Sequence, residues 1–171
     1  MTNDNILQRS GLIAKCSYAL LLLLALSSCV PDTVCRLEMD VRLKVVMQGD
    51  SVSERGQTIR YSSFDCISVV PVDYDSLVYN NSTNISSLLL PLKDDTTLTQ
   101  YLLTYRGKTD TLTILHTNEM NFIDMACGCV CYHTIDSISY TTHWMDEVEL
   151  INQQVVRQPM DNLKIHLHGS K

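Results

Sequence analysis

Hydrophobic and polar side chains alternate strictly between residues 35 and 48. The apolar positions share one parity: Cys35, Leu37, Met39, Val41, Leu43, Val45 and Met47. The charged and polar positions take the other parity, with Val46 as the exception: Arg36, Glu38, Asp40, Arg42, Lys44 and Gln48. Successive side chains of a β-strand point to opposite faces, whereas a helix would spread these charges around its circumference. The pattern predicts a strand over Cys35–Met47 with one buried face, ended by Gly49-Asp50-Ser51.

Shorter runs of the same kind recur towards the C-terminus. Thr58–Val70 has apolar positions for one or two strands, and Leu88–Leu92 predicts a buried strand that Pro91 ends or places at an edge. Pro71–Asp75 and Asn80–Asn84 have the composition of turns. The other expected strands are Ser76–Tyr79, Asn121–Tyr132, Asp136–Tyr140, Glu147–Ile151 and Leu163–Leu167.

The clearest hairpin lies between residues 98 and 116. Its first arm, Leu98–Tyr105, places three large side chains on one face: Tyr101, Leu103 and Tyr105. The chain turns at Arg106–Lys108, and Asp110–His116 returns with Leu112 and Ile114 on one face. No segment has a convincing helical pattern, since Met145–Gln154 fits a strand equally well.

About eight to ten short strands joined by polar turns predict an all-β fold. We expect a single antiparallel β-sandwich, immunoglobulin-like or related, because the 171 residues correspond to about one domain after a removable leader. The chain is 45% hydrophobic and 19% charged, which argues against a disordered chain or a polytopic membrane protein. The net charge of −6 argues against nucleic-acid binding, which needs a basic surface.

The first 28 residues have the features of a signal peptide. Arg9 and Lys15 form a positive region around the start of an apolar run that is densest at Leu20–Leu24. The run is shorter than the about 20 residues of helix that cross a bilayer core. It therefore indicates a cleaved leader rather than a permanent membrane span.

The leader ends in Leu26-Ser27-Ser28-Cys29, which resembles the bacterial lipobox. The resemblance implies cleavage between Ser28 and Cys29, a diacylglycerol on the Cys29 sulfur and acylation (for example by palmitate) of the new amino group. Several acyl chains on one residue give stable membrane anchoring. The alternative is an ordinary secretory cleavage that leaves Cys29 as a disulfide partner.

The residues behind Cys29 bear on where the anchored protein resides. Val30 follows the cysteine in place of aspartate, which by analogy with lipoprotein sorting favours the outer membrane. Asp32 alone gives weak support for export to the cell surface, so the face of the membrane stays open. We expect a lipidated tether over residues 29–34 and the β-sandwich domain over 35–171, with no cofactor besides the covalent lipid.

Five cysteines follow the anchor: Cys35, Cys66, Cys127, Cys129 and Cys131. An exported compartment is oxidising enough for disulfides, and an odd number permits two bridges and one free thiol. In an extended strand the last three share one face but lie too far apart to bridge one another easily. We expect Cys35 to pair with Cys127 and Cys66 to pair with Cys129 or Cys131; buried free thiols are the alternative.

A ligand site in the Cys127–His133 region is the functional alternative. Cys129, Cys131 and His133 would line one strand face, and zinc or Cu(I) accepts thiolate and imidazole ligands. The spacing lacks the two-residue gap of a zinc knuckle. Trp144, with acidic residues beside it, is a second candidate, for a sugar or a cation, although a lone tryptophan is more often part of the core.

Catalytic motifs are absent from the sequence. It contains no Gly-x-Ser-x-Gly, no His-Glu-x-x-His and no phosphate-binding loop. The lack of these motifs in the sequence therefore favours a binding or structural module over an enzyme.

Several short segments occur in a characteristic order: Leu90-Pro91-Leu92, Asp110-Thr111-Leu112-Thr113-Ile114, Ala126-Cys127-Gly128, Val148-Glu149-Leu150-Ile151-Asn152 and Asn162-Leu163-Lys164-Ile165. Their order resembles an uncharacterised family of Bacteroidetes lipoproteins. The resemblance implies a lipobox leader followed by one β-rich domain of unknown function, and it supplies no site residues.

We therefore expect an outer-membrane lipoprotein of the cell envelope. Its partners would be membrane lipid, through the anchor, and an unknown envelope protein or glycan. Exposed edge strands of a sandwich can accept a strand of a partner. A glycan- or metal-binding protein is the alternative.

Overall fold

A computed structural model describes residues 35, 37, 39–52, 58–73, 77–158 and 160–170 of the chain, without the side chains of residues 51, 52, 58 and 168–170. Residues 36–171 form one compact unit. The predicted leader, the Ser28–Cys29 cleavage site and the tether over residues 29–34 lie outside the described residues.

The described residues form eleven strands and no helix. The strands are β1 (Arg42–Val52), β2 (Thr58–Tyr61), β3 (Ile67–Pro71), β4 (Tyr79–Ser82), β5 (Ser87–Pro91), β6 (Leu98–Tyr105), β7 (Lys108–Asp124), β8 (Gly128–Tyr140), β9 (Met145–Leu150), β10 (Gln154–Val155) and β11 (Asp161–Ser170). Within this part of the chain, a helix of sufficient length and hydrophobicity to span a bilayer is not found.

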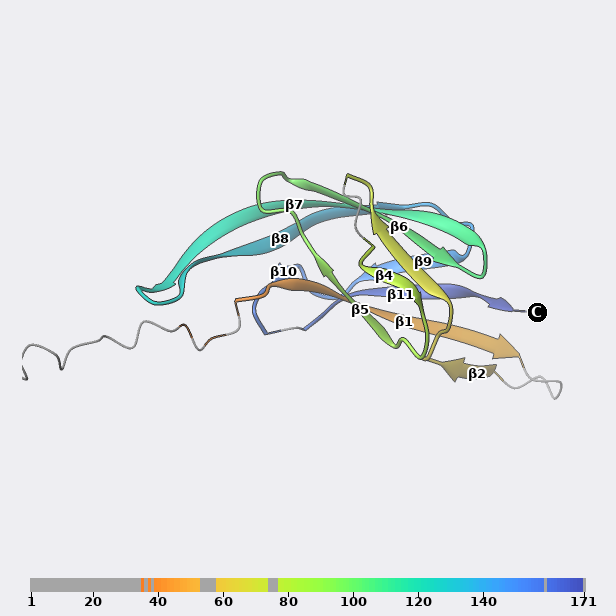
Figure 1. Ribbon diagram of the computed structural model, residues 1–171. Coiled ribbons are helices and arrows are strands. Elements are labelled where there is room, and N and C mark those ends of the chain that lie inside the picture. The colour runs from red at the N-terminus through yellow and green to blue at the C-terminus, as the bar shows by residue number, and fades with distance from the viewer. Residues whose placement is uncertain are drawn as a thin grey trace, which may run out of the picture. The chain divides into compact units, whose positions relative to one another are not determined.

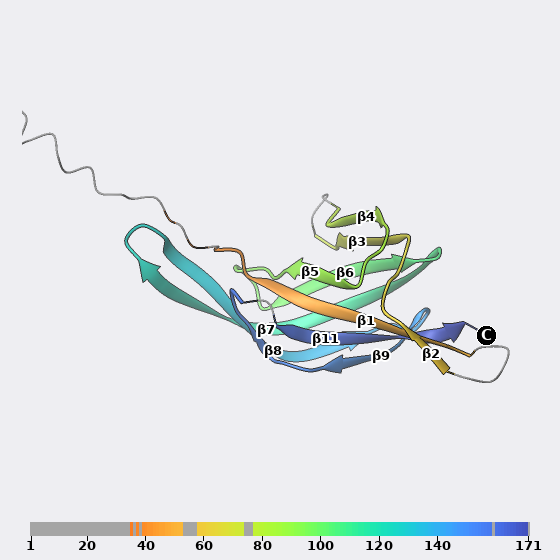
Figure 2. The same ribbon diagram turned by 90° about the horizontal axis from the view of Figure 1, so that it is seen from below.

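Two sheets pack face to face and form the sandwich that the alternating pattern predicts (Figure 1). The five-stranded sheet has the order β2-β1-β11-β9, with β5 paired to β1 ahead of β2. The six-stranded sheet has the order β10-β8-β7-β6-β3-β4. Seen from below, the long β7–β8 hairpin continues beyond the strands of the other sheet (Figure 2). The all-β fold class is therefore confirmed.

Alternate side chains of the long strands fill the space between the sheets. In β1 the buried residues are Leu43, Val45 and Met47, and in β6 and β7 they include Tyr101, Leu103, Leu112 and Ile114. These are the positions that the alternation assigned to the inner face. The hairpin between residues 98 and 116 is also confirmed, with Arg106 and Gly107 at positive φ in the turn.

One strand pair departs from the expected antiparallel arrangement. β11 runs parallel to β1, with Val45 opposite Leu163 and Met47 opposite Ile165. β11 follows β10 of the opposite sheet and enters between β1 and β9. Alternation reports which face a residue occupies, so it identifies the strand without fixing its neighbours or its direction.

The first strand begins later than the pattern predicts. β1 starts at Arg42, and Leu37 is exposed although its parity is that of the inner face. Pairing with β5 begins at Arg42 opposite Pro91, where β5 ends. Residues 35, 37 and 39–41, which the structure describes ahead of β1, do not belong to a strand.

The first strand also ends later, because Gly49 belongs to it. Gly49 pairs with Tyr61 of β2, and the tyrosine ring lies over the position that a Cβ would occupy. A glycine inside a strand often marks such a close approach. The predicted break at Gly49–Ser51 was therefore wrong, and the strand runs on to Val52.

The short strand expected over Ser76–Tyr79 is displaced. β4 begins at Tyr79 and takes in part of the asparagine-rich turn. Asn81 and Asn84 still have positive φ, a backbone conformation that asparagine tolerates in turns.

The buried carboxylate of Asp110, on β7 of the six-stranded sheet, binds the connection between β8 and β9, which runs from one sheet to the other. Asp110 of β7 has no solvent exposure. Its oxygens accept hydrogen bonds from the Thr141 hydroxyl at 2.6 Å, the His143 and Trp144 amides at 2.8 Å and the Met145 amide at 3.0 Å. Residues 141–144 carry the chain from β8 in one sheet to β9 in the other. The carboxylate therefore accepts the hydrogen bonds of backbone amides in this connection, which lie between the hydrogen-bonding pattern of β8 and that of β9.

The hydrogen bonds determine how Asp110 titrates. Burial by itself raises the pKa of this carboxyl, but the hydrogen bonds from Thr141 and the three amides outweigh it and hold the pKa well below its usual range. A depressed carboxyl pKa stabilises the fold above the unfolded-state value of about 3.9, and this stabilisation is lost as the pH falls further.

Asp110→Asn should lower the free energy of unfolding at pH 7 by about 2–4 kcal/mol, because an amide offers one acceptor oxygen and aims an N–H at other donors. Denaturant unfolding from pH 7 to pH 2 would measure the effect. The difference between variant and wild type should shrink below about pH 4. Asp136→Asn, at an exposed carboxylate that accepts a hydrogen bond from the Thr117 hydroxyl, is the matched control. A pH-independent difference would contradict the assignment.

Gly49→Ala should destabilise the domain by about 1–3 kcal/mol, because the new methyl group overlaps the Tyr61 ring and displaces it from Phe64. A double-mutant cycle with Tyr61→Ala checks the cause. In the Tyr61→Ala background, Gly49→Ala should be neutral or slightly stabilising, since alanine is otherwise preferred over glycine in a strand. An equal cost in both backgrounds would contradict the ring as the cause.

Candidate functional site

The inner face of the β7–β8 hairpin changes character along its length. Near the β6–β7 turn it contributes Leu112 and Ile114 to the core. Further along the same face come His116 and Asn118, then Met120 and Phe122, which are exposed. The polar residues therefore lie where the hairpin passes from the two-layered core to a single layer.

Asn118 is the centre of the polar group. Its amide nitrogen lies 3.1, 2.9 and 2.8 Å from the carbonyl oxygens of Lys93, Asp94 and Thr96. Carbonyl oxygens can only accept, so this nitrogen is the donor and the orientation of the amide is determined. The side chain thereby holds the loop between β5 and β6 against β7.

The amide oxygen of Asn118 accepts hydrogen bonds from two histidine rings. Nδ1 of His116 lies 2.7 Å from it and Nδ1 of His133 lies 2.8 Å from it. Because an amide oxygen only accepts, both Nδ1 atoms carry their hydrogen, and in the neutral rings both Nε2 atoms present a lone pair. The two rings meet edge to face with their centroids 5.2 Å apart.

The two lone pairs face different surroundings. Nε2 of His116 lies 2.8 Å from the Thr99 hydroxyl, which also accepts the Lys93 amide at 3.1 Å. Nε2 of His133 instead faces Oδ1 of Asp94 at 3.5 Å. Burial, followed by the charge of His116, lowers the pKa of His133, and the Asp94 carboxylate opposes this. The neutral ring is thus favoured, with its lone pair directed at a carboxylate.

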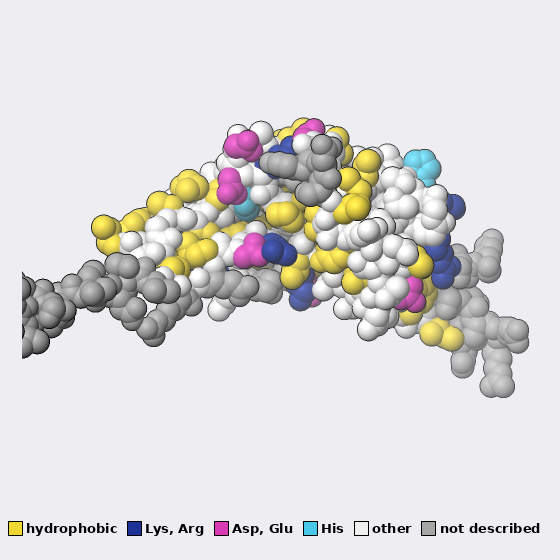
Figure 3. Space-filling view, viewed as in Figure 1, with side chains coloured by type: hydrophobic (Ala, Val, Ile, Leu, Met, Phe, Trp, Pro, Cys, Tyr) yellow, Lys and Arg dark blue, Asp and Glu magenta, His cyan; other side chains and the backbone are white. Residues whose placement is uncertain are grey.

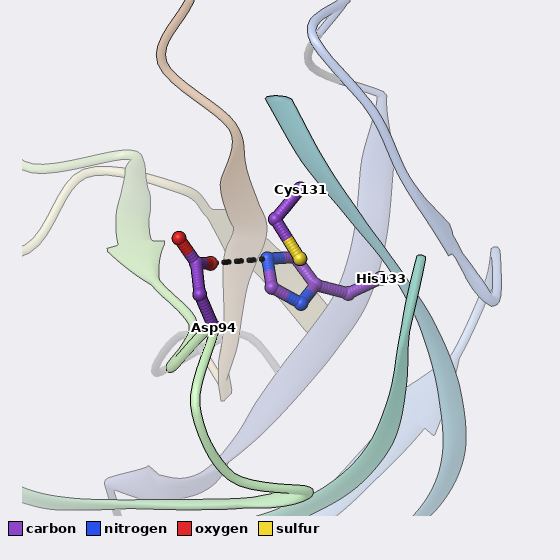
Figure 4. A group of neighbouring side chains, drawn as sticks. All are labelled: Asp94, Cys131 and His133. Carbon is purple, nitrogen blue, oxygen red and sulfur yellow. Dashed lines mark ion pairs between the residues drawn. The ribbon is translucent and has the colours of Figure 1, made fainter. Parts of the chain in front are cut away.

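Cys131 completes the group, which we call the Asp94–Cys131–His133 cluster (Figure 4). One ligand atom from each of the three residues lies within 4.8 Å of the other two. Cys131 and His133 come from alternate positions of β8 and are buried, whereas Asp94 comes from the β5–β6 loop and is exposed. Burial and the Asp94 carboxylate raise the pKa of the Cys131 thiol.

A pocket of about 430 Å³ borders the cluster at Asp94, and Thr99, the partner of His116, also lines it. Its remaining wall is mainly apolar, with Tyr101 and Leu92 among the lining residues. Lys93 forms an ion pair with Asp73 at its edge. The cluster is therefore accessible from solvent on the Asp94 side.

The end of the hairpin is exposed and apolar. Met120, Phe122 and Met125 are 65%, 63% and 94% exposed, and hydrophobic side chains follow the projecting hairpin in Figure 3. The turn itself is ordered by Asp124, whose carboxylate accepts the amides of Ala126 and Cys127 at 2.8 and 2.6 Å.

The cysteines divide into two groups. Cys35 and Cys127, the residues of the first expected bridge, are each disulfide-bonded. Cys66, Cys129 and Cys131 carry free thiols.

The second expected bridge, from Cys66 to Cys129 or Cys131, is absent. Cys66 precedes β3 near the β6–β7 turn, whereas Cys131 pairs with Met120 towards the opposite end of β7. Twelve residues of strand separate these levels, which is about 40 Å. The spacing of Cys127, Cys129 and Cys131 in the sequence could not reveal that they lie at the end of the β7–β8 hairpin opposite to Cys66.

Two other predicted site residues lie elsewhere than expected. Cys129 is exposed beside Phe122 and is not part of the cluster, so the expected Cys129–Cys131–His133 set is replaced by one containing Asp94. Trp144 is 4% exposed, and its indole nitrogen donates to the Leu103 carbonyl at 3.0 Å. Its ring packs against Tyr105 in the core, so it is not available to stack on a sugar.

Asp94 and Asn118 could not be identified from local sequence. Asp94 lies in a loop that reads as a solvated turn, and its separation from Cys131 in the chain hides their proximity. The one usable signal is the predicted hairpin of residues 98–116. Its register places the loop that enters β6 beside the end of the returning arm, where the His116 amide bonds the Thr97 carbonyl.

Comparison with known proteins places the domain without assigning it an activity. No curated protein and no solved structure matches the chain. Residues 66–167 match a family of unknown function, DUF6452, which takes in the β7–β8 hairpin and every residue of the Asp94–Cys131–His133 cluster. The chain belongs to the DUF6452 family.

Proposed function

We propose that this protein is a lipid-anchored, non-catalytic binding module of the bacterial cell envelope. The lipobox at residues 26–29 supports the anchor, and the absence of catalytic motifs supports a binding role. Its resemblance to Bacteroidetes lipoproteins and the Val30 that follows Cys29 support an outer-membrane location. The acyl chains on Cys29 would hold the sandwich at the membrane, where one chain alone would bind only marginally.

The observation that carries the binding role is the outer half of the β7–β8 hairpin. Between Glu119 and Asp124, β7 pairs with β8 and with no other strand in the described part of the chain. The outer part of β8, from Gly128 to Tyr132, pairs with β7 and with no further strand among the described residues. Unpaired strand edges beside an exposed apolar face form a surface on which an extended segment can be added.

We infer that the partner is an extended, largely apolar segment of another envelope protein. Backbone hydrogen bonds along a hairpin edge would supply affinity, and the Met120 and Phe122 side chains would receive its alternate residues. Methionines adapt to different partner shapes because their side chains are unbranched and flexible. A glycan receives less support, since the Trp144 ring that could stack on a sugar is buried.

The expected pairing of Cys35 with Cys127 fits this proposal. Cys35 follows Cys29 by six positions, a reach of about 20 Å when the chain is fully extended. A bridge from Cys35 to Cys127 would keep the hairpin turn close to the membrane surface. It would also limit the motion of an edge that must receive a partner strand.

The anchor is tested on the native N-terminus. Wild-type protein from bacterial membranes should begin at Cys29, carry acyl chains on that residue and enter the detergent phase. Cys29→Ser should remain unlipidated, and Cys16→Ser, within the leader, is the matched control that should behave as wild type. Intact-mass analysis and phase partitioning measure both. An unmodified Cys29 thiol on protein released into buffer would contradict the anchor.

The hairpin surface is tested by capture from detergent-solubilised membranes. Replacing Phe122 or Met120 by serine should reduce the yield of a specific co-purifying protein at least about tenfold, since loss of a buried apolar anchor costs binding free energy of this order. Leu77→Ser is the control, because Leu77 is 53% exposed but far from the hairpin in the sheet order. Equal yields from all variants would refute the surface.

A further inference from the structure

We propose that Asp94, Cys131 and His133 bind one zinc ion, with a fourth coordination position open to water or a small ligand. The inference does not depend on the lipid anchor or on the partner of the hairpin. It rests on the separation of the three ligand atoms, on the group that orients His133 and on the charge of the site.

The separation of the ligand atoms fits a tetrahedral zinc site. Zinc bonds nitrogen and oxygen at about 2.0–2.2 Å, which places two such ligands roughly 3.4 Å apart. Nε2 of His133 lies 3.5 Å from Oδ1 of Asp94. The Cys131 sulfur lies within 4.8 Å of one ligand atom of each of the other two residues. Figure 4 shows the Asp94 carboxylate facing a ring nitrogen of His133, with the Cys131 sulfur drawn close to the ring.

Asn118 orients His133 as a metal ligand. Its oxygen accepts the Nδ1 hydrogen at 2.8 Å, so Nε2 carries the lone pair and faces the Asp94 carboxylate at 3.5 Å. Metal-binding histidines almost always donate their other ring hydrogen in this way. His133 is 2% exposed, and the other atom that faces its lone pair is a carboxylate oxygen, which cannot donate a hydrogen when ionised. A cation bound between the Nε2 lone pair and the Asp94 carboxylate would relieve the repulsion between these two acceptors.

The charges of the donor set select the metal. A thiolate, a carboxylate and a neutral imidazole together neutralise a divalent cation, as a mostly buried site requires. A carboxylate ligand disfavours Cu(I), which prefers sulfur and imidazole, whereas zinc accepts all three donor types. Three protein ligands leave one tetrahedral position free for water or a small ligand, and the exposed Asp94 is the member of the cluster that borders the pocket.

The same residues could be read as a thiol nucleophile with a histidine base. Catalytic cysteines are accessible and lie beside groups that favour the thiolate. Cys131 is buried and lies next to a carboxylate, which opposes a free thiolate. A bound cation would instead favour the Cys131 thiolate, because the thiolate and the Asp94 carboxylate would both contact the cation.

Zinc binding is measured on the purified full-length protein in detergent. After removal of metal, the wild type should bind one equivalent of zinc in a chelator competition. Cobalt in its place should give a thiolate-to-cobalt charge-transfer band together with the strong visible absorption of tetrahedral cobalt. Cys131→Ser should remove the charge-transfer band, and Asp94→Asn should weaken zinc binding at least about tenfold.

Matched controls separate the site from its neighbours. Cys129→Ser changes the exposed thiol two positions earlier on β8, and Asp95→Asn changes the next exposed carboxylate; both should bind zinc as the wild type does. Asp94 is exposed, so its variant should fold normally, as circular dichroism would verify. Less than one tenth of an equivalent of zinc, or a cobalt thiolate band that survives Cys131→Ser, would overturn the proposal. Either result leaves the anchor and the hairpin surface untouched.

Discussion

The unequal length of the two sheets is the constraint on which the other features depend. β7 has 17 residues and β8 has 13, whereas β1, the longest strand of the opposite sheet, has 11. At about 3.3 Å per residue, β7 extends roughly 20 Å further than β1 can cover. Its inner face must therefore change partners, from core side chains to the β5–β6 loop and then to solvent. The polar cluster and the exposed tip are successive consequences of that one mismatch.

Buried polar side chains mark the places where the chain leaves a ladder. Asp110 receives the amides of the crossing from β8 to β9. Asn162 accepts the Lys44 amide and donates to the carbonyls of Asn152 and Gln154, at the crossing from β9 to β10. Asn118 donates to three carbonyls of the β5–β6 loop. In each case one side chain supplies hydrogen bonds to backbone groups of a crossing that have left the ladder.

The sequence predicted the strands well and their partners poorly, for a physical reason. A period of two is a local property, so Leu43, Val45, Tyr101 and Leu103 could be assigned to the inner face directly. Pairing depends on residues far away in the chain, and neither the parallel β1–β11 pair nor the solvent exposure of Leu37 has a local signature. The same limit applied to the site: alternation placed Cys131 and His133 on one face, but the third member came from a distant loop.

The parallel pairing of β1 with β11 joins the first described strand of the sandwich to the last. The β6–β7–β8 meander needs only neighbouring segments and can form early, since local loops close at low entropic cost. The five-stranded sheet cannot close until the C-terminal residues arrive, and until then β1 and β9 have no strand between them. The order of the strands along the chain therefore makes the closing of this second layer a late event in folding, because it waits for β11.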